Sequence, residues 1–393
     1  MPIRAHFVEI RRELALILAF SPKEKEQPSR FLFGEDSFSR DLCGGRRATG
    51  VATAIPLFRF GNYSRLKARK NLTVIALLEI KNLQVEFRSD RQVVRAVDGV
   101  SFSIAPGETL GLVGESGSGK SVTALSIGRL LRAPPAFYAG GEIYLEGRDV
   151  LKASKRELQA LRGRVVSYIF QEPGASLNPV FRIGAQIKES LQLHRPDAAT
   201  EAEVVRLLNQ VGIPAPEARA KNYPHEMSGG MQQRAMIAMA LAAEPKLLVA
   251  DEPTTALDVT IQAQILALLK EVQQRLGMSL LLITHNLGIV GQMADRVAVM
   301  YAGQIVEMAP ARELLRRPLH PYTRALLRAA PRLGGSGRLA NIPGSVPRPG
   351  AMPGGCRFHP RCTMARPECA VKEPELREVE NGRHVRCPYW NTP

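Results

Sequence analysis

The stretch Gly114-Glu115-Ser116-Gly117-Ser118-Gly119-Lys120-Ser121 decides the fold. The apolar run Glu108–Gly114 before it predicts a buried strand, and a helical pattern after it runs to Arg132. Strand, glycine-rich loop and helix in this order are typical of a phosphate-binding loop, whose backbone N–H groups point inward at the anion. A glycine-rich turn with no ligand is the alternative, but the flanking strand and helix favour phosphate binding.

The loop assigns a role to each of its polar residues. We expect Lys120 to reach the β- and γ-phosphates of a nucleotide and the Ser121 hydroxyl to ligate Mg²⁺. The backbone from Gly114 to Val122 would hold the remaining phosphate oxygens, helped by the positive end of the helix dipole. The phosphates of a nucleotide and Mg²⁺ are therefore the expected ligands.

A second motif, Lys246–Pro253, is an apolar strand that ends in two carboxylates. Asp251 is placed to hold Mg²⁺ through water, and Glu252 is placed to orient or deprotonate the attacking water. Paired acids after a strand also occur as plain helix N-caps. Their combination with the phosphate loop favours the catalytic interpretation.

Between the two motifs, His225–Arg234 contains Ser228-Gly229-Gly230, and here the chain resembles the ATP-binding subunits of ABC transporters. The resemblance implies that ATP is shared between two such subunits, with Ser228–Gly230 facing the γ-phosphate held by the partner. It implies that Glu252 and His285 carry out hydrolysis. Three further residues take family roles: Gln171 as a catalytic residue and Mg²⁺ ligand, Asp258 (in Ala256-Leu257-Asp258) at the subunit contact, and Phe87 stacking on adenine.

Four stretches narrow the resemblance to the dipeptide and oligopeptide importers: 171–179, the signature through Met239, 251–259, and Leu319-His320-Pro321-Tyr322-Thr323. The resemblance covers about residues 77–390. It implies coupling of ATP hydrolysis to peptide uptake, two membrane permeases as partners, and a second, related ATPase subunit. It also implies an indirect link to a periplasmic or lipid-anchored solute-binding protein, and a peripheral position on the cytoplasmic face of the inner membrane.

Other functions remain as alternatives. The same machinery could import nickel, glutathione or opine-like solutes. A soluble ABC ATPase acting on ribosomes or DNA would suit the net charge of +16, but basic residues are spread along the chain and we expect no nucleic-acid partner. A non-hydrolysing regulatory subunit is disfavoured because Lys120, Asp251, Glu252 and His285 are all present.

Composition and patterning divide the chain into three parts. Residues 1–76 keep no helix or strand period and predict a disordered extension or a wrongly assigned start. Residues 77–315 alternate strand-like and helix-like runs, which predicts an α/β domain with a largely parallel sheet. The resemblance implies a P-loop NTPase fold with a RecA-like core, an antiparallel β subdomain and a helical subdomain near 172–240. Residues 316–393 are expected to form a small extension.

The apolar run Leu14–Phe20 is far shorter than the ~20 residues that span a bilayer.

Four cysteines, Cys356, Cys362, Cys369 and Cys387, lie in the extension, whereas the remainder of the chain has only Cys43. Disulfides are unexpected in a cytoplasmic ATPase, so the cluster predicts a metal site. The spacing does not match the C-x₂-C pairs of zinc fingers and leaves Zn²⁺ and a [4Fe–4S] cluster both open. The resemblance to dipeptide ATPases implies the [4Fe–4S] cluster. We expect His359 to be structural.

Overall fold

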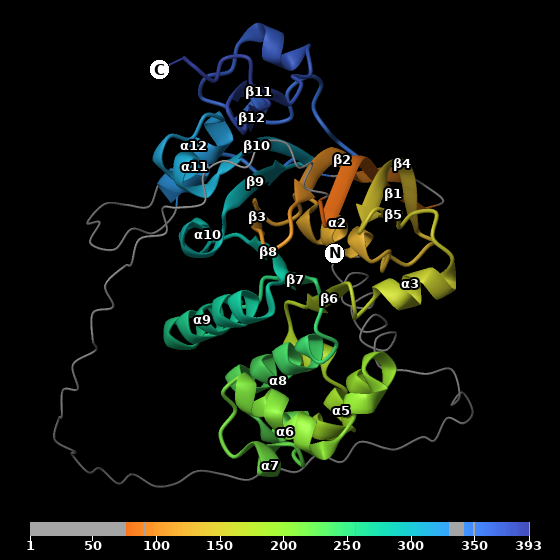
Figure 1. Ribbon diagram of the computed structural model, residues 1–393. Coiled ribbons are helices and arrows are strands. Elements are labelled where there is room, and N and C mark those ends of the chain that lie inside the picture. The colour runs from red at the N-terminus through yellow and green to blue at the C-terminus, as the bar shows by residue number, and fades with distance from the viewer. Residues whose placement is uncertain (1–75, 90–91, 256, 330–341, 349, 393) are drawn as a thin grey trace, which may run out of the picture. The chain divides into compact units, whose positions relative to one another are not determined.

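The computed structural model describes residues 76–89, 92–255, 257–329, 342–348 and 350–392. The predicted N-terminal extension, 1–76, lies outside the described residues except for its last position. The described residues belong to one compact unit. The predicted α/β class is confirmed, with one mixed sheet, one antiparallel sheet and a set of helices (Figure 1).

The antiparallel sheet has the strand order β2-β1-β4-β5. Its strands are β1 (Leu78–Ser89), β2 (Gln92–Ile104), β4 (Ala136–Leu145) and β5 (Arg148–Asp149). In β1, Leu78 and Ile80 are buried, and after a register shift Leu83 and Val85 are buried as well. Period-two burial is what one covered face of an antiparallel sheet requires.

The main sheet has the strand order β11-β12-β10-β9-β3-β8-β7-β6. Its strands are β3 (Thr109–Val113), β6 (Val166–Ile169), β7 (Leu247–Asp251), β8 (Ser279–Thr284), β9 (Arg296–Tyr301), β10 (Gln304–Pro310), β11 (Arg377–Glu380) and β12 (Arg383–Val385). The five strands from β6 to β9 are parallel. Every residue of β3, β7 and β8 is buried, as expected for parallel strands covered on both faces.

All the chain between β6 and β7 that forms regular structure is helical. The elements are α4 (Pro173–Ser176), α5 (Ile183–His194), η1 (Pro196–Ala198), α6 (Glu201–Gln210), α7 (Pro216–Arg219), η2 (Pro224–Glu226) and α8 (Gly229–Leu241). The helices α5, α6, α7 and α8 gather beyond β6, the edge strand of the main sheet (Figure 1). This is the region in which the sequence predicts a helical subdomain.

The other helices connect strands or follow the sheet. They are α2 (Lys120–Ile127), α3 (Lys155–Leu161), α9 (Val259–Leu276), α10 (Leu287–Met293), α11 (Ala311–Arg316), α12 (Pro321–Ala329), η3 (His359–Arg361) and η4 (Pro367–Ala370). The prediction of a helix to Arg132 is wrong, because α2 ends at Ile127. Arg129 has a φ of 50°, in the left-handed region that a right-handed helix cannot include.

The second half of α8 is buried on most of its faces. Of the six residues from Ala235 to Ala240, five are buried, and only Met239 is partly exposed. The helix therefore lies inside the apolar core that the parallel strands share with α5, α6 and α9. Small residues at its surface allow this close packing.

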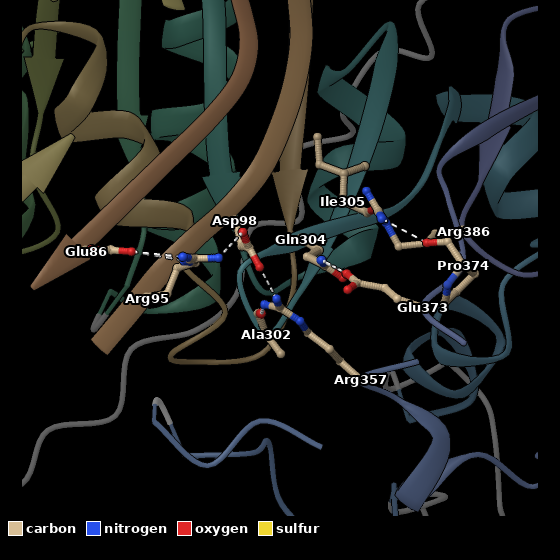
Figure 2. A network of polar contacts seen from close by, with 10 residues as sticks. All are labelled: Glu86, Arg95, Asp98, Ala302, Gln304, Ile305, Arg357, Glu373, Pro374 and Arg386. Carbon is tan, nitrogen blue, oxygen red and sulfur yellow. Dashed lines mark hydrogen bonds and ion pairs between the residues drawn. The ribbon is translucent and has the colours of Figure 1, made fainter. Parts of the chain in front are cut away.

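The cysteine-bearing segment is attached to the cassette at several points. Its strand β12 pairs with β10, so the extension continues the main sheet. Figure 2 shows the polar contacts beside this junction: Arg357 pairs with Asp98 of β2, and Gln304 of β10 bonds to Glu373. The Arg386 guanidinium donates to the carbonyl of Ile305 at 3.0 Å. These contacts fix the extension against both sheets.

Glu307 of β10 holds the start of α12. Its side chain is fully buried and accepts the N–H groups of Leu319 and His320 at 2.9 and 2.8 Å. The Arg383 guanidinium lies 3.7 Å away. Burial raises the pKa of Glu307, while these donors oppose that shift. The His-Pro-Tyr stretch is thus fixed to the main sheet by one carboxylate.

None of the described helices has the length and apolarity needed to cross a bilayer.

Candidate nucleotide site

The residues singled out from the sequence follow the carboxyl ends of neighbouring parallel strands. The phosphate loop follows β3, Glu252 follows β7, His285 follows β8, and Gln171 lies two residues beyond β6. Because parallel strands end at the same edge, the sheet order β3-β8-β7-β6 places these four segments side by side. Ligands of open α/β sheets bind at this edge.

Two positions of the phosphate loop, Gly114 and Gly119, leave no room for a side chain. A Cβ on Gly114 would lie 2.1 Å from the Met300 carbonyl oxygen, and a Cβ on Gly119 would lie 2.6 Å from the Ala96 carbonyl oxygen. Gly119 has a φ of 102° and is the N-cap of α2. The loop is therefore packed closely against β2, β9 and the β9–β10 turn.

Lys120 is buried within the loop. Its Nζ atom donates to the carbonyls of Gly114 and Glu115 at 2.8 and 2.9 Å and lies 3.4 Å from the Ser118 hydroxyl. Burial lowers the pKa of the Lys120 ammonium, and the nearby carboxylates, that of Glu252 foremost, oppose this shift. Ser121 is half-buried and Val122 buried in the first turn of α2. The lysine thus braces the loop from its inner side.

Glu252 is the centre of a polar cluster. Its carboxylate accepts from the Gln171 amide at 3.0 Å and from the Thr255 hydroxyl at 2.9 Å, and it lies 3.2 Å from His285 Nδ1. Its φ of 49° lies in the left-handed region, which is unusual for a non-glycine residue. Asp251, the last residue of β7, is buried. The fold therefore brings together the side chains of Gln171, Glu252 and His285, which lie far apart along the chain.

The alternative for the acid pair, a plain helix N-cap, is wrong. The next helix, α9, begins at Val259, and its N-cap is Asp258, whose carboxylate accepts the Ile261 N–H at 2.9 Å. Asp251 and Glu252 lie before a turn rather than at a helix start. The pair is therefore left facing the phosphate-loop edge of the sheet.

Ser228, Gly229 and Gly230 form the start of α8, in the helical group rather than in the phosphate loop (Figure 1). The Ser228 hydroxyl accepts the Met231 N–H at 3.4 Å, a long N-cap bond. A Cβ on Gly230 would lie 3.1 Å from Ile261 in the first turn of α9. The signature and Asp258 therefore lie at two adjacent helix starts. Ala256 lies outside the described residues.

Phe87 lies on β1 and pairs across the antiparallel sheet with Val94 and Ala136. Its ring is partly buried against the apolar core. Adenine stacking by Phe87 stays a prediction.

Sequence reasoning missed two residues that touch the phosphate loop. The Tyr322 hydroxyl accepts the Glu115 N–H at 2.9 Å, and the Arg361 guanidinium pairs with the Glu115 carboxylate at 2.6 Å. Tyr322 belongs to the quoted His-Pro-Tyr stretch, which could have marked it. Arg361 carries no sequence signal, because its partner lies 246 residues away.

The four clustered cysteines line one cavity of 290 Å³ in the extension. The N–H of Cys356 donates to the carbonyl of Cys369 at 2.8 Å, which joins two of them through the backbone. Burial raises the pKa of Cys387 to about 11. In the part of the chain that the structure describes, no three His, Cys, Asp or Glu side chains are close enough to hold a single ion. His359 bonds to the Cys356 carbonyl, consistent with the structural role expected for it.

Comparison with known proteins agrees with the geometry. Residues 97–255 match the family model described as ABC transporter, and residues 306–369 match the oligopeptide/dipeptide transporter C-terminal region. A putative peptide import ATP-binding protein of Brucella melitensis is 50% identical over 321 residues, which cover 81% of this chain and 96% of that protein. A probable peptide ABC transporter ATP-binding protein of Sinorhizobium fredii is 48% identical over 326 residues, 82% of this chain and 97% of that protein.

Among solved structures, the ATP-binding cassette MJ0796, in a dimeric post-hydrolysis state with ADP and phosphate, superimposes with a TM-score of 0.54 at 25% identity. The match covers 60% of this chain and 99% of that cassette. The P-loop fold expected from residues 114–121 is thereby confirmed. The chain belongs to the ABC transporter family, and within it to the ATP-binding proteins of peptide importers.

Proposed function

We propose that the chain binds ATP at the phosphate loop and hydrolyses it with Glu252 as the general base. The observation that carries this is the position of Glu252. Its carboxylate lies between the side chains of Gln171 and His285. It follows β7, and a single strand, β8, separates β7 from β3, which the phosphate loop follows. A carboxylate fixed by three side chains is pre-organised to hold one water in line with the γ-phosphate. The reaction is the attack of that water on the γ-phosphorus, giving ADP and phosphate.

The surrounding residues divide the work. Lys120 would bind the β- and γ-phosphate oxygens, exchanging its bonds to the loop carbonyls for bonds to the anion. His285, whose side chain is exposed, would orient Glu252 and reach the transferred phosphate. Gln171 donates to Glu252 and would keep its carboxylate aimed at the water. Phe87 is the proposed contact for adenine.

A magnesium ion is expected with the nucleotide. The Ser121 hydroxyl, the Gln171 amide oxygen and, through water, Asp251 form the hard oxygen donor set that this ion prefers. All three follow or begin elements that meet at the carboxyl edge of the main sheet. The ion would neutralise charge on the β- and γ-phosphates. The residues present thus fit a bound Mg²⁺.

A second cassette would complete the site. Ser228–Gly230 lies at the start of the 13-residue helix α8, whose free N–H groups favour an anion. We propose that this helix start binds the γ-phosphate of the partner's ATP, and that Asp258 lies at the same subunit contact. Val259, which follows Asp258, leaves 81% of its surface exposed and would be covered there. A related second subunit, rather than a copy, is the proposed partner.

The cargo is proposed to be a peptide. The supporting observations are the two family matches and the relatives' descriptions as peptide import proteins. Two membrane permeases would receive the chain as a peripheral subunit at the cytoplasmic face, and a periplasmic or lipid-anchored binding protein would supply the solute. The loop after 171–179 exposes Val180 by 72% and Phe181 by 48%, which suits contact with permease loops. Nickel, glutathione or another small solute is the alternative cargo.

Capture of the complex tests the import proposal. We expect the Glu252→Gln protein, extracted in mild detergent with ATP, to retain two multi-span permeases and a second cassette ATPase, all identified by mass spectrometry. The variant is used because blocked hydrolysis should keep the subunits together. Capture with the Lys120→Ala protein serves as the control without bound nucleotide. Recovery of ribosomal or DNA-repair proteins without permeases would contradict the proposal.

We further propose that Cys356, Cys362, Cys369 and Cys387 hold a [4Fe–4S] cluster. All four line one cavity, which fits a shared ligand. Four cysteine thiolates are the ligand set of a [4Fe–4S] cluster, and the resemblance to dipeptide ATPases favours this cluster over Zn²⁺. The role supported here is a structural one.

Metal analysis distinguishes the two ligands. Protein purified without oxygen is expected to contain roughly four iron and four sulfide per chain and to absorb visible light, as [4Fe–4S] proteins do. Cys369→Ala should lose the iron, whereas Cys43→Ser should keep it because Cys43 lies outside the cluster. One zinc per chain and no iron would contradict the cluster. Metal-free protein with four free thiols would contradict both metals.

A further inference from the structure

The cysteine-bearing segment contacts the phosphate loop through Arg361. Its Nη1 and Nη2 atoms lie 2.6 and 3.1 Å from the two carboxylate oxygens of Glu115, the second residue of the loop. The Arg361 side chain is only 5% exposed. Two parallel bonds from a planar guanidinium fix a carboxylate in direction as well as in distance. The side chain of Glu115 is therefore held by a residue of the extension.

The backbone of the same loop residue is held by α12. The Glu115 N–H donates to the Tyr322 hydroxyl at 2.9 Å. The Tyr322 ring packs on Tyr301 and Phe358, with ring centres 4.6 and 5.3 Å apart. Tyr322 is fully buried, so its hydroxyl has little freedom to move. The N–H and the carboxylate of Glu115 are thus both bonded to residues beyond 316, while its carbonyl is bonded to Lys120.

A second tether runs from Arg357, four residues before Arg361. Figure 2 shows Arg357 between Asp98 of β2 and the carbonyl of Ala302. The next residue, Gly303, donates its N–H to the Ser118 carbonyl of the phosphate loop at 2.9 Å. Arg357 therefore fixes the turn on which the far side of the loop rests. The segment holds the loop at two points.

The negative charge of Glu115 explains why its ion pair with Arg361 matters for ATP binding. A phosphate loop binds ATP through inward N–H groups and a lysine, all of them positive. A carboxylate at the second position opposes this, because like charges at short distance repel. Paired with Arg361 on the outer side of the loop, the carboxylate is neutralised and turned toward the extension. Without that partner it would be free to face the phosphates.

We propose that Arg361 is a positioning residue for ATP binding: it neutralises Glu115 and holds the phosphate loop in its binding conformation. The extension is then a working part of the nucleotide site as well as an attached segment. This inference rests on the proposed role of residues 114–121 in ATP binding. It adds a residue that acts through Glu115 and does not touch the nucleotide.

The test is a charge-rescue cycle on ATP affinity. We expect Arg361→Gln to weaken binding of a fluorescent ATP analogue roughly tenfold, the size of an ordinary coupling between sites. Adding Glu115→Gln should restore most of the lost affinity, because it removes the carboxylate that Arg361 neutralises. A merely structural role for Arg361 predicts no rescue, since the double variant loses the same contact. Equal weakening in the single and double variants would overturn the proposal.

Two further proteins complete the design. Arg386→Gln removes a different, half-buried attachment of the extension, the bonds to the Ile305 and Pro374 carbonyls, and leaves Glu115 untouched. It should lower the thermal midpoint as Arg361→Gln does but leave ATP affinity within about twofold of wild type. Equal loss of affinity in both would also overturn the proposal. Lys120→Ala tests the loop itself. If this variant binds ATP like wild type, the proposed function fails. If Lys120→Ala does not bind ATP but Arg361→Gln binds it with wild-type affinity, only the present inference is refuted.

Discussion

The Glu252→Gln protein is expected to bind ATP and to lose its turnover. An amide cannot accept a proton from water, and loss of a general base typically costs 10²- to 10⁴-fold in rate. The change keeps the size of the side chain and one acceptor oxygen for the Gln171 amide and the Thr255 hydroxyl. ATP should therefore still bind and hold two cassettes together. Phosphate release measures the first effect, and size-exclusion chromatography with ATP measures the second.

A matched acidic residue provides the control for that result. Glu271 lies on α9 with its side chain 71% exposed, well outside the Glu252 cluster. Glu271→Gln is expected to hydrolyse ATP at the wild-type rate. Glu252→Gln with native turnover would show that another group activates the water. Loss of ATP binding in that variant would instead show that Glu252 supports the loop.

The Lys120→Ala protein is expected to lose ATP binding altogether in ordinary assays. The ammonium would make charge-assisted bonds to two phosphates, and the loss of two such bonds amounts to roughly 100-fold or more in affinity. The variant also loses the bonds to the Gly114 and Glu115 carbonyls, which brace the loop from inside. Titration with a fluorescent ATP analogue measures this effect.

Lys152 offers the control, because it pairs with Asp149 on the antiparallel sheet with its side chain 78% exposed. Lys152→Ala is expected to bind ATP like wild type, since exposed ion pairs contribute little. A Lys120→Ala protein that binds ATP within a few-fold of wild type would contradict the assignment of residues 114–121. Unfolded Lys120→Ala protein would be detected by circular dichroism.

The parts of the site that sequence predicts well are local or strongly patterned. Gly114–Ser121 carries its own strand, loop and helix start, so eight consecutive residues define the phosphate loop. The acids Asp251 and Glu252 follow a run of buried apolar residues that can only be an inner strand. Gln171 and His285 lie 81 and 33 residues from Glu252, and only the family resemblance joined them to it before the structure did.

The parts that sequence missed depend on distant contacts. Nothing near Arg361 signals that its guanidinium lies against Glu115, because the fold alone brings the extension to the loop. The end of α2 was misplaced because the left-handed conformation of Arg129 is set by its surroundings, not by its own preference. The burial of α8 likewise depends on neighbouring helices and strands, which a single helical pattern does not contain.

Peptide uptake by the reconstituted complex tests the central claim most directly. The complex captured through this chain would be placed in proteoliposomes with ATP inside, and labelled dipeptides and oligopeptides would be supplied outside with the solute-binding protein. The account predicts ATP-dependent accumulation of peptide with the wild-type chain and none with Glu252→Gln. A complex that hydrolyses ATP but accumulates only nickel or glutathione, or no solute at all, would contradict it.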